Sequence, residues 1–241
     1  MIKDSKTPEH ARDVTRQRRR GRRALAYCSR KNGDVEVRVE SGLEHMVGML
    51  LEADPRVVSY VAQPFVVELE SNAVLANKDA YIKKPGVKSR FYTPDFVCRM
   101  DDGSLLVVDA KHDQFLEKFE ERREDISQCL RGHGMDFRII PQSQIDAVVM
   151  RNISILNGWR ANHLDQYVKA YSEEVCRILE TKPIWQADEL SQHLSAGKAA
   201  ICCALLTGVL KSNLRQCLFS GVAVVSAAHG DLHHFEILEI R

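Results

Sequence analysis

Two apolar segments separated by three turn-forming residues constrain the fold of this chain more than any other feature. Residues 91–100 and 104–111 are rich in β-branched, aromatic and aliphatic side chains, and Asp101-Asp102-Gly103 lies between them. This pattern predicts a β-hairpin. The second segment contains Leu105-Leu106-Val107-Val108, which is apolar on both faces, as is typical of a strand in the middle of a sheet.

The loop of this hairpin decides which side chains share a face. A two-residue turn at Asp102-Gly103 would place Asp95 opposite Ala110, so that Asp95 and Asp109 would lie on opposite faces. A three-residue loop, with Gly103 in the left-handed conformation, instead places Asp95 opposite Asp109. Because side chains alternate along a strand, Lys111 then lies on the same face. We predict this second register.

Two facing acids and a lysine suit the hydrolysis of a phosphodiester. Asp95 and Asp109 would repel each other across the strand pair, and a bound divalent cation would remove that cost. Mg²⁺ prefers carboxylate oxygens, and Lys111 would lie near the attacking water or the developing charge. The alternative is structural: Asp95 is then a strand-edge acid after a proline, and Asp109 and Lys111 form a plain ion pair.

A third acid, Glu44, lies at the start of a predicted helix over residues 41–52, whose apolar residues recur at helical spacing. Ser41-Gly42-Leu43-Glu44 has the spacing of a capping box, in which the glutamate only reaches back to the start of the helix. The other two acids and the lysine favour a role for Glu44 at the metal site.

An acid, then Pro-Asp, then Asp-x-Lys on the next apolar strand is the residue order of the PD-(D/E)xK nucleases. More narrowly, the chain resembles the TnsA family, the nuclease subunit of heteromeric cut-and-paste transposases. The matching segments follow one another in order between residues 41 and 140. They are Ser41–Glu44, Glu52–Tyr60, Gln63-Pro64, Tyr92–Phe96, Val108–Lys111 and Gly134–Ile140.

The resemblance implies an α/β fold in which helices flank a restriction-endonuclease-like mixed β-sheet. It implies that Glu44, Asp95 and Asp109 surround Mg²⁺, for which Mn²⁺ can substitute, and that Lys111 is the catalytic lysine. It further implies nicking of double-stranded DNA at the 5′ ends of a transposon. An integrase-type partner transposase would cut and join the 3′ ends, and an ATPase regulator would control both.

Two other functions fit the same residues. The first is a stand-alone phage, repair or restriction-type nuclease with the same core. The second is a non-catalytic DNA-binding scaffold that keeps the fold without the metal. The intact set of acids and lysine argues against the scaffold.

The charge of the chain is uneven along its length. Residues 1–23, a basic N-terminal arm, carry nine lysines and arginines against three acids, whereas residues 24–141 carry sixteen against twenty. Such a basic segment can neutralise DNA phosphates, although it is also compatible with a solvated tail. The predicted DNA-binding residues of the arm are Arg16, Arg18, Arg19, Arg20, Arg22 and Arg23.

Composition favours a cytoplasmic protein without a membrane span. The N-terminus has no apolar core of a signal peptide, and no stretch approaches the length of an apolar membrane helix. The seven cysteines lie at irregular positions without a Cys-x-x-Cys pair, which indicates reduced thiols and no structural zinc.

The nuclease domain is expected to cover residues 24–141. Within it we predict a strand near residues 35–39, an extended segment over 57–69 that bends at Pro64, and a loop or insertion over 72–88. A helix over 112–131 and a strand over 136–140 follow the hairpin. The right-handed crossover would place this last strand parallel to residues 105–111.

Residues 142–241 are expected to form a second domain that resembles a winged helix. Helices are predicted over 165–180, 186–190 and 198–210, with strands over 222–226 and 235–240. In a DNA-binding winged helix, the segment 198–210 would enter the major groove. We favour a role in docking protein partners, because residues 199–206 are apolar nearly all round and this domain has no basic excess.

Overall fold

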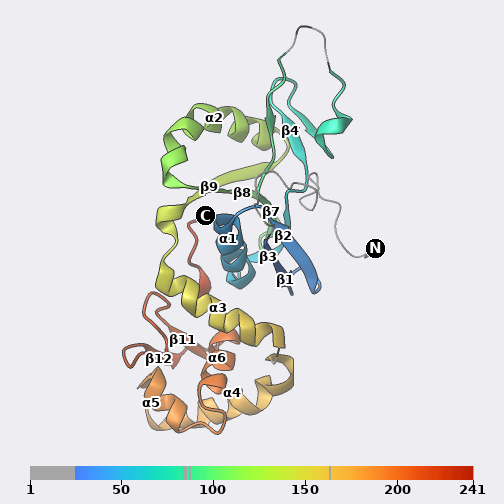
Figure 1. Ribbon diagram of the computed structural model, residues 1–241. Coiled ribbons are helices and arrows are strands. Elements are labelled where there is room, and N and C mark those ends of the chain that lie inside the picture. The colour runs from blue at the N-terminus through green and yellow to red at the C-terminus, as the bar shows by residue number, and fades with distance from the viewer. Residues whose placement is uncertain (1–24, 84–85, 87, 163, 241) are drawn as a thin grey trace. The chain divides into compact units, whose positions relative to one another are not determined.

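The computed structural model describes residues 25–83, 86, 88–162 and 164–240, and it has a mixed α/β architecture (Figure 1). The chain divides into two compact units, which are treated separately below. Unit 1 comprises Met1–Glu52, Arg56–Gln144 and Ile240–Arg241, and unit 2 comprises Ala53–Pro55 and Ile145–Glu239. Among the described residues, no helix combines the length and apolar character needed to cross a membrane.

A four-stranded mixed sheet forms the centre of unit 1. Its strands are β3 (Val57–Ala62), β7 (Phe96–Met100), β8 (Leu105–Lys111) and β9 (Met135–Pro141), in the spatial order β3-β7-β8-β9. β8 pairs antiparallel with β7 and parallel with β9. The predictions of a central apolar strand and of a parallel crossover are therefore confirmed.

The register of the β7–β8 hairpin is the predicted one. The ladder pairs Phe96 with Val108 and Arg99 with Leu105. The backbone N–H of Met100 donates to the carbonyl of Ser104 at 2.9 Å, and Gly103 closes the loop with φ of +85°. The ladder pairs Phe96 with Val108. Continued by one residue, the same antiparallel register places Asp95 opposite Asp109.

Helix α2 (Leu116–Gly132) makes the crossover and follows a short 3-10 turn, η3 (Asp113–Phe115). Figure 1 shows the helix alongside β9. Its apolar side buries Ile126, Cys129 and Leu130 against Val107 of β8 and Phe137 of β9. This packing covers one side of the two parallel strands and fixes where β8 ends.

A β-hairpin and a helix precede the sheet in sequence. The hairpin consists of β1 (Leu25–Ser29) and β2 (Val35–Val39), of which the sequence predicted the second strand alone. Helix α1 (Gly42–Ala53) follows. Its buried Glu52 accepts hydrogen bonds from Ser29 Oγ at 2.6 Å and from the Tyr60 hydroxyl at 2.9 Å, so it joins the hairpin, the helix and β3.

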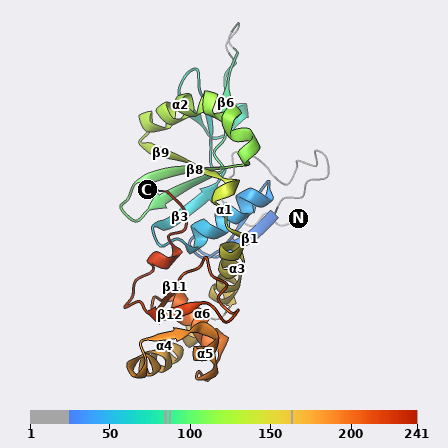
Figure 2. The same ribbon diagram turned by 90° about the vertical axis from the view of Figure 1, so that its left-hand side faces the viewer.

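The segment predicted as a loop or insertion, residues 72–88, contributes residues 73–75 to a second, three-stranded sheet, and its other described residues form no strand. The strands of this sheet are β4 (Val66–Glu68), β5 (Ala73–Leu75) and β6 (Phe91–Tyr92), in the order β5-β4-β6, with a 3-10 turn η2 (Lys78–Ala80). The chain bends between β3 and β4, as Pro64 predicted, with Gln63 at φ of +47°. Figures 1 and 2 both show this sheet extending away from the four-stranded one.

Unit 2 contains four helices and a small antiparallel sheet. The helices are α3 (Ala147–Asn162), α4 (Leu164–Thr181), α5 (Ala187–Gln192) and α6 (Lys198–Leu206). The strands are β10 (Ile184–Gln186), β11 (Leu210–Ser212) and β12 (Val224–Ala227), in the order β10-β12-β11. The 3-10 turn η5 (His233–Phe235) also lies in unit 2, whereas η4 (Gln142–Gln144) is at the end of the main segment of unit 1.

Several sequence expectations for this region are wrong. Residues 235–240 form no strand: the buried side chains of Phe235, Leu238 and Ile240 do not alternate, and η5 occupies the start of the segment. Helix α6 ends at Leu206 rather than at residue 210. Gly208 lies just beyond that end with φ of +71°, where a Cβ would come within 2.7 Å of the Gly230 backbone. Helix α3 was not predicted.

Candidate metal centre and catalytic lysine

The β7–β8 hairpin brings Asp109 and Lys111 into direct contact. The ammonium nitrogen of Lys111 lies 2.6 Å from Oδ2 of Asp109, and their side chains are 22% and 1% exposed. Burial alone would lower the pKa of Lys111, but the carboxylates of Asp109 and Asp95 together raise it. The lysine therefore stays charged, and its aliphatic stem leads to an ammonium 4.8 Å from the centre of the Phe119 ring.

Asp95 faces this pair from the neighbouring strand. Its Oδ2 accepts a hydrogen bond from the backbone N–H of Ala110 at 2.8 Å, which fixes the carboxylate against β8. Burial, followed by the negative charges of Asp109 and Glu44, raises the pKa of Asp95 well above its usual range, and Lys111 offsets this in part. The environment of Asp95 thus disfavours its charged form when no metal ion is bound.

Asp109 is fully buried, and its charged partner is Lys111. The 2.6 Å between the Lys111 ammonium nitrogen and Oδ2 of Asp109 is the distance of a charge-assisted hydrogen bond. Burying a carboxylate is costly unless it is hydrogen-bonded, paired or bound to a metal, and here the ion pair offsets part of that cost. A cation held by Asp95 and Asp109 would also remove the repulsion between the two acids.

Glu44 lies in the first turn of α1 and makes the capping box. Its Oε2 accepts from the Glu40 N–H at 2.9 Å, its Oε1 accepts from Ser41 Oγ at 2.7 Å, and its own N–H donates to Ser41 Oγ at 3.1 Å. Burial raises the pKa of Glu44, and the charge of Asp109 contributes to this shift. Glu44 is therefore close enough to Asp109 to sense its charge, while both of its oxygens serve the helix cap.

The donor set fits Mg²⁺ through two acids rather than three. Within the part of the chain that the structure describes, no three histidines, cysteines, aspartates or glutamates are arranged to hold a metal ion. Mg²⁺ commonly binds proteins through one or two carboxylates and keeps several waters. The facing pair of Asp95 and Asp109 meets that requirement, whereas Glu44 would have to leave its cap to join it.

Two further residues, Tyr92 and Arg122, lie at this site, and the sequence did not predict either as a site residue. The Tyr92 hydroxyl is buried beside Asp109, and burial followed by the charges of Asp109 and Asp95 raises its pKa well above its usual range. Arg122 of α2 donates from Nη2 to the carbonyl of Phe91 at 3.1 Å. Tyr92 lies three residues before Asp95, but the strand carrying it belongs to the second sheet, which its local sequence does not reveal.

The remaining predicted site residues lie outside the described part of the chain. They are Arg16, Arg18, Arg19, Arg20, Arg22 and Arg23 of the basic N-terminal arm. No disulfide joins any two of the seven cysteines, all of which lie in the described part of the chain.

No protein-family model matches this chain, and a search of curated proteins gives no significant match.

Proposed function

We propose that this protein is a Mg²⁺-dependent DNA endonuclease of the PD-(D/E)xK type that nicks the 5′ ends of a transposon as one subunit of a heteromeric transposase. One observation carries the nuclease proposal. The buried carboxylate of Asp109 faces Asp95 across the strand pair and lies 2.6 Å from the Lys111 ammonium. The subunit role rests on the resemblance to the TnsA family in residues 41–140.

Asp95 and Asp109 would hold the metal ion, and Glu44 would join them as a third acid on leaving its helix cap. When bound, Mg²⁺ would polarise the phosphate and lower the pKa of a coordinated water. The 22% exposed Lys111 side chain would present its ammonium to the attacking water or to the charge that develops on the phosphate. Burial of Asp109 keeps bulk water away from these charges, so each acts in a medium of low dielectric constant.

The same proposal gives unit 2 the role of a winged-helix-like docking module. The order β10, α5, α6, β11 and β12, with the sheet order β10-β12-β11, supports the winged-helix comparison. Residues 200–206 of α6 are all buried, so this helix has no exposed face for reading the major groove. Unit 2 would instead contact the integrase-type transposase or the ATPase regulator.

The decisive experiment is cleavage of a plasmid that carries transposon ends, in the presence of the neighbouring transposase and Mg²⁺. We expect Lys111→Ala to lose at least about 100-fold in 5′-end cleavage, because charge-stabilising groups contribute that much in comparable sites. Lys118→Ala removes an exposed lysine of the adjoining helix and serves as the matched control. Wild-type cleavage by Lys111→Ala would contradict the proposal. If no integrase-type gene lies next to the gene of this protein, and the protein cleaves DNA by itself, the stand-alone nuclease is favoured instead.

A non-catalytic scaffold is the second candidate. It is favoured by the ion pair between Lys111 and Asp109 and by the engagement of both Glu44 oxygens in the helix cap. Isothermal calorimetry with Mg²⁺ and Mn²⁺ separates the two functions. A nuclease should bind the cation in the wild type and lose this binding in Asp95→Ala, whereas a scaffold should show no binding in either.

A further inference from the structure

The second sheet of unit 1 carries an extension that the nuclease proposal leaves without a role. We call residues 71–89 the lysine ribbon; they contain β5 and η2 and connect β4 to β6. Residues 84, 85 and 87 lie outside the described part of the chain, and Figures 1 and 2 show the described remainder of the ribbon extending past α2. Part of it is locally ordered, because Asn77 Oδ1 caps η2 by accepting from the Ala80 N–H at 3.0 Å, and the Tyr81 ring packs edge-on against Phe91.

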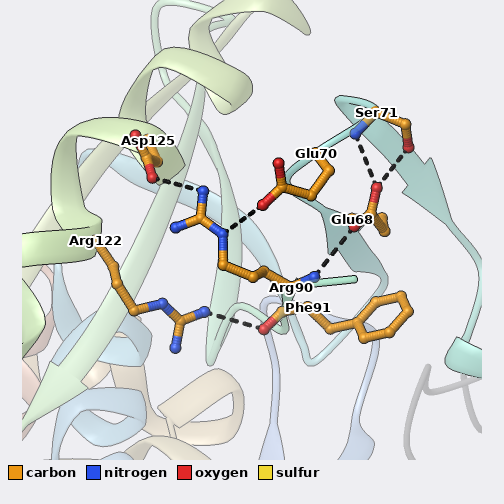
Figure 3. Close-up of polar contacts among 7 residues, drawn as sticks. All are labelled: Glu68, Glu70, Ser71, Arg90, Phe91, Arg122 and Asp125. Atoms are coloured by element: carbon orange, nitrogen blue, oxygen red, sulfur yellow. Dashed lines mark hydrogen bonds and ion pairs between the residues drawn. The ribbon is translucent and has the colours of Figure 1, made fainter. Parts of the chain in front are cut away.

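A network of polar contacts fixes the base of the ribbon to the body of unit 1 (Figure 3). Arg90 donates from Nε to Glu70 at 2.6 Å and pairs through Nη2 with Asp125 of α2 at 2.9 Å. The fully buried Glu68 accepts from the Ser71 N–H at 2.8 Å and from the Arg90 N–H at 3.2 Å. The ribbon is therefore held at both of its ends.

The charge of the ribbon is opposite to that of its surroundings. Residues 71–89 contain four lysines and one aspartate, whereas the rest of residues 24–141 contains twelve lysines and arginines against nineteen acids. An excess of positive charge confined to one projecting segment is the electrostatic footprint expected of a surface that binds a polyanion.

Three described lysines of the ribbon lack acidic partners, as do the exposed Lys118 and Arg138 elsewhere in unit 1, whereas two arginines of α2 are paired. Lys78, Lys83 and Lys88 are exposed, and none forms an ion pair with a described residue. Arg123 and Arg131 of α2, by contrast, pair with Glu120 at 3.0 Å and with Glu124 at 2.8 Å. The three ribbon lysines thus remain available to an external anion.

The ribbon also lies close to the candidate metal centre along the chain. β6 follows the ribbon directly, and Asp95 lies five residues after Arg90. At about 3.3 Å per residue, the base of the ribbon lies at most about 17 Å from Asp95. One turn of duplex DNA rises about 34 Å, so phosphates within about half a turn of the cleaved bond are within reach of this base.

The geometry points to the lysine ribbon as a clamp for the DNA backbone, in which Lys78, Lys83 and Lys88 contact phosphates of the bound duplex. This inference rests on the proposed nuclease function and adds a binding surface to it. The side chain of Ile82 is 87% exposed beside Lys83, and it would provide an apolar contact with the sugars of a groove.

The test is the salt dependence of DNA binding by the full chain, measured by fluorescence anisotropy with a short labelled duplex and no divalent cation. Each phosphate contact contributes about 0.9 to the slope of log K against log salt concentration. The triple variant Lys78→Gln, Lys83→Gln, Lys88→Gln should therefore reduce the slope by up to about 2.7. The matched control Arg38→Gln, Arg123→Gln, Arg131→Gln removes three arginines that pair with acids, and it should leave the slope unchanged.

The outcomes separate this inference from the proposed function. If the wild type binds the duplex and the ribbon variant keeps the wild-type slope, the clamp is refuted and the nuclease proposal stands. An equal reduction of the salt slope in the ribbon and control variants would also refute the clamp, because it would reflect net charge alone. A wild type that binds no duplex even at low salt would refute the DNA-directed function itself.

Discussion

Replacement of Asp95 by asparagine should stabilise unit 1 in the absence of Mg²⁺, even though it removes a proposed metal ligand. Burial and the charges of Asp109 and Glu44 raise the pKa of Asp95 well above its usual range, so its surroundings disfavour the charged form. Asparagine has nearly the same shape, carries no charge and can still accept the hydrogen bond from the Ala110 N–H.

The expected size of this effect follows from the strand pairing. Like charges placed directly opposite each other on neighbouring strands cost up to about 1 kcal/mol. For a protein of this length, 1 kcal/mol corresponds to about 2–4 °C in melting temperature. We therefore expect Asp95→Asn to raise the melting temperature of the transition that includes unit 1 by about 2–4 °C at neutral pH without a divalent cation.

Mg²⁺ should make the wild type more stable than Asp95→Asn. A ligand that binds the folded state alone stabilises it by about 2.7 kcal/mol at a concentration 100 times its Kd. The wild type should gain this stabilisation, and Asp95→Asn should gain little. Asp102→Asn, in the exposed loop of the same hairpin, is the control and should respond to Mg²⁺ as the wild type does.

The dependence on pH provides a second check. Because the folded-state pKa of Asp95 lies above its ordinary value of 3.8, the wild type loses stability as the pH rises from that value through the raised pKa. The advantage of Asp95→Asn should therefore grow with pH and then level off. Thermal unfolding monitored by circular dichroism measures both effects. A variant less stable than the wild type at neutral pH without Mg²⁺ would refute the reasoning.

Three further predictions test other parts of the structure. Gly103→Val should cost about 1–2 kcal/mol in chemical denaturation, because φ is +85° in the hairpin loop and a β-branched residue is strained there; Gly103→Asn should cost less. Glu44→Gln keeps one acceptor for the Glu40 N–H, and its amide NH2 can donate to Ser41 Oγ, so it should unfold nearly like the wild type; a loss of cleavage in this variant would assign Glu44 to the metal centre. Burial lowers the pKa of His234 to about 4 from an ordinary 6.5, so the stability that depends on its neutral form should decrease as the pH falls from about 6.5 towards about 4. His234→Gln should flatten the pH dependence of unfolding in that window, and an unchanged profile would show that His234 is not its source.

The sequence by itself determined the hairpin and the face on which its polar residues lie. Asp101-Asp102-Gly103 allows a loop whose glycine adopts a positive φ, and the strict alternation of side chains then places Asp95, Asp109 and Lys111 on one face. These features depend on neighbours within a few residues, so local chemistry is enough to fix them. The parallel pairing of β9 with β8 followed from the order of strand, helix and strand along the chain.

Tertiary structure decided the contacts between distant segments. The sequence left two roles open for Glu44, and the structure gives it the cap while placing it near Asp109. The sheet of β4, β5 and β6, anchored through Arg90 and Asp125, was not foreseen because its strands are two or three residues long and carry too little periodicity to be recognised. The same holds for residues 235–240, whose apolar side chains are buried by packing without forming a strand. Short segments of this kind adopt their conformation through burial against the rest of the fold, which no local pattern specifies.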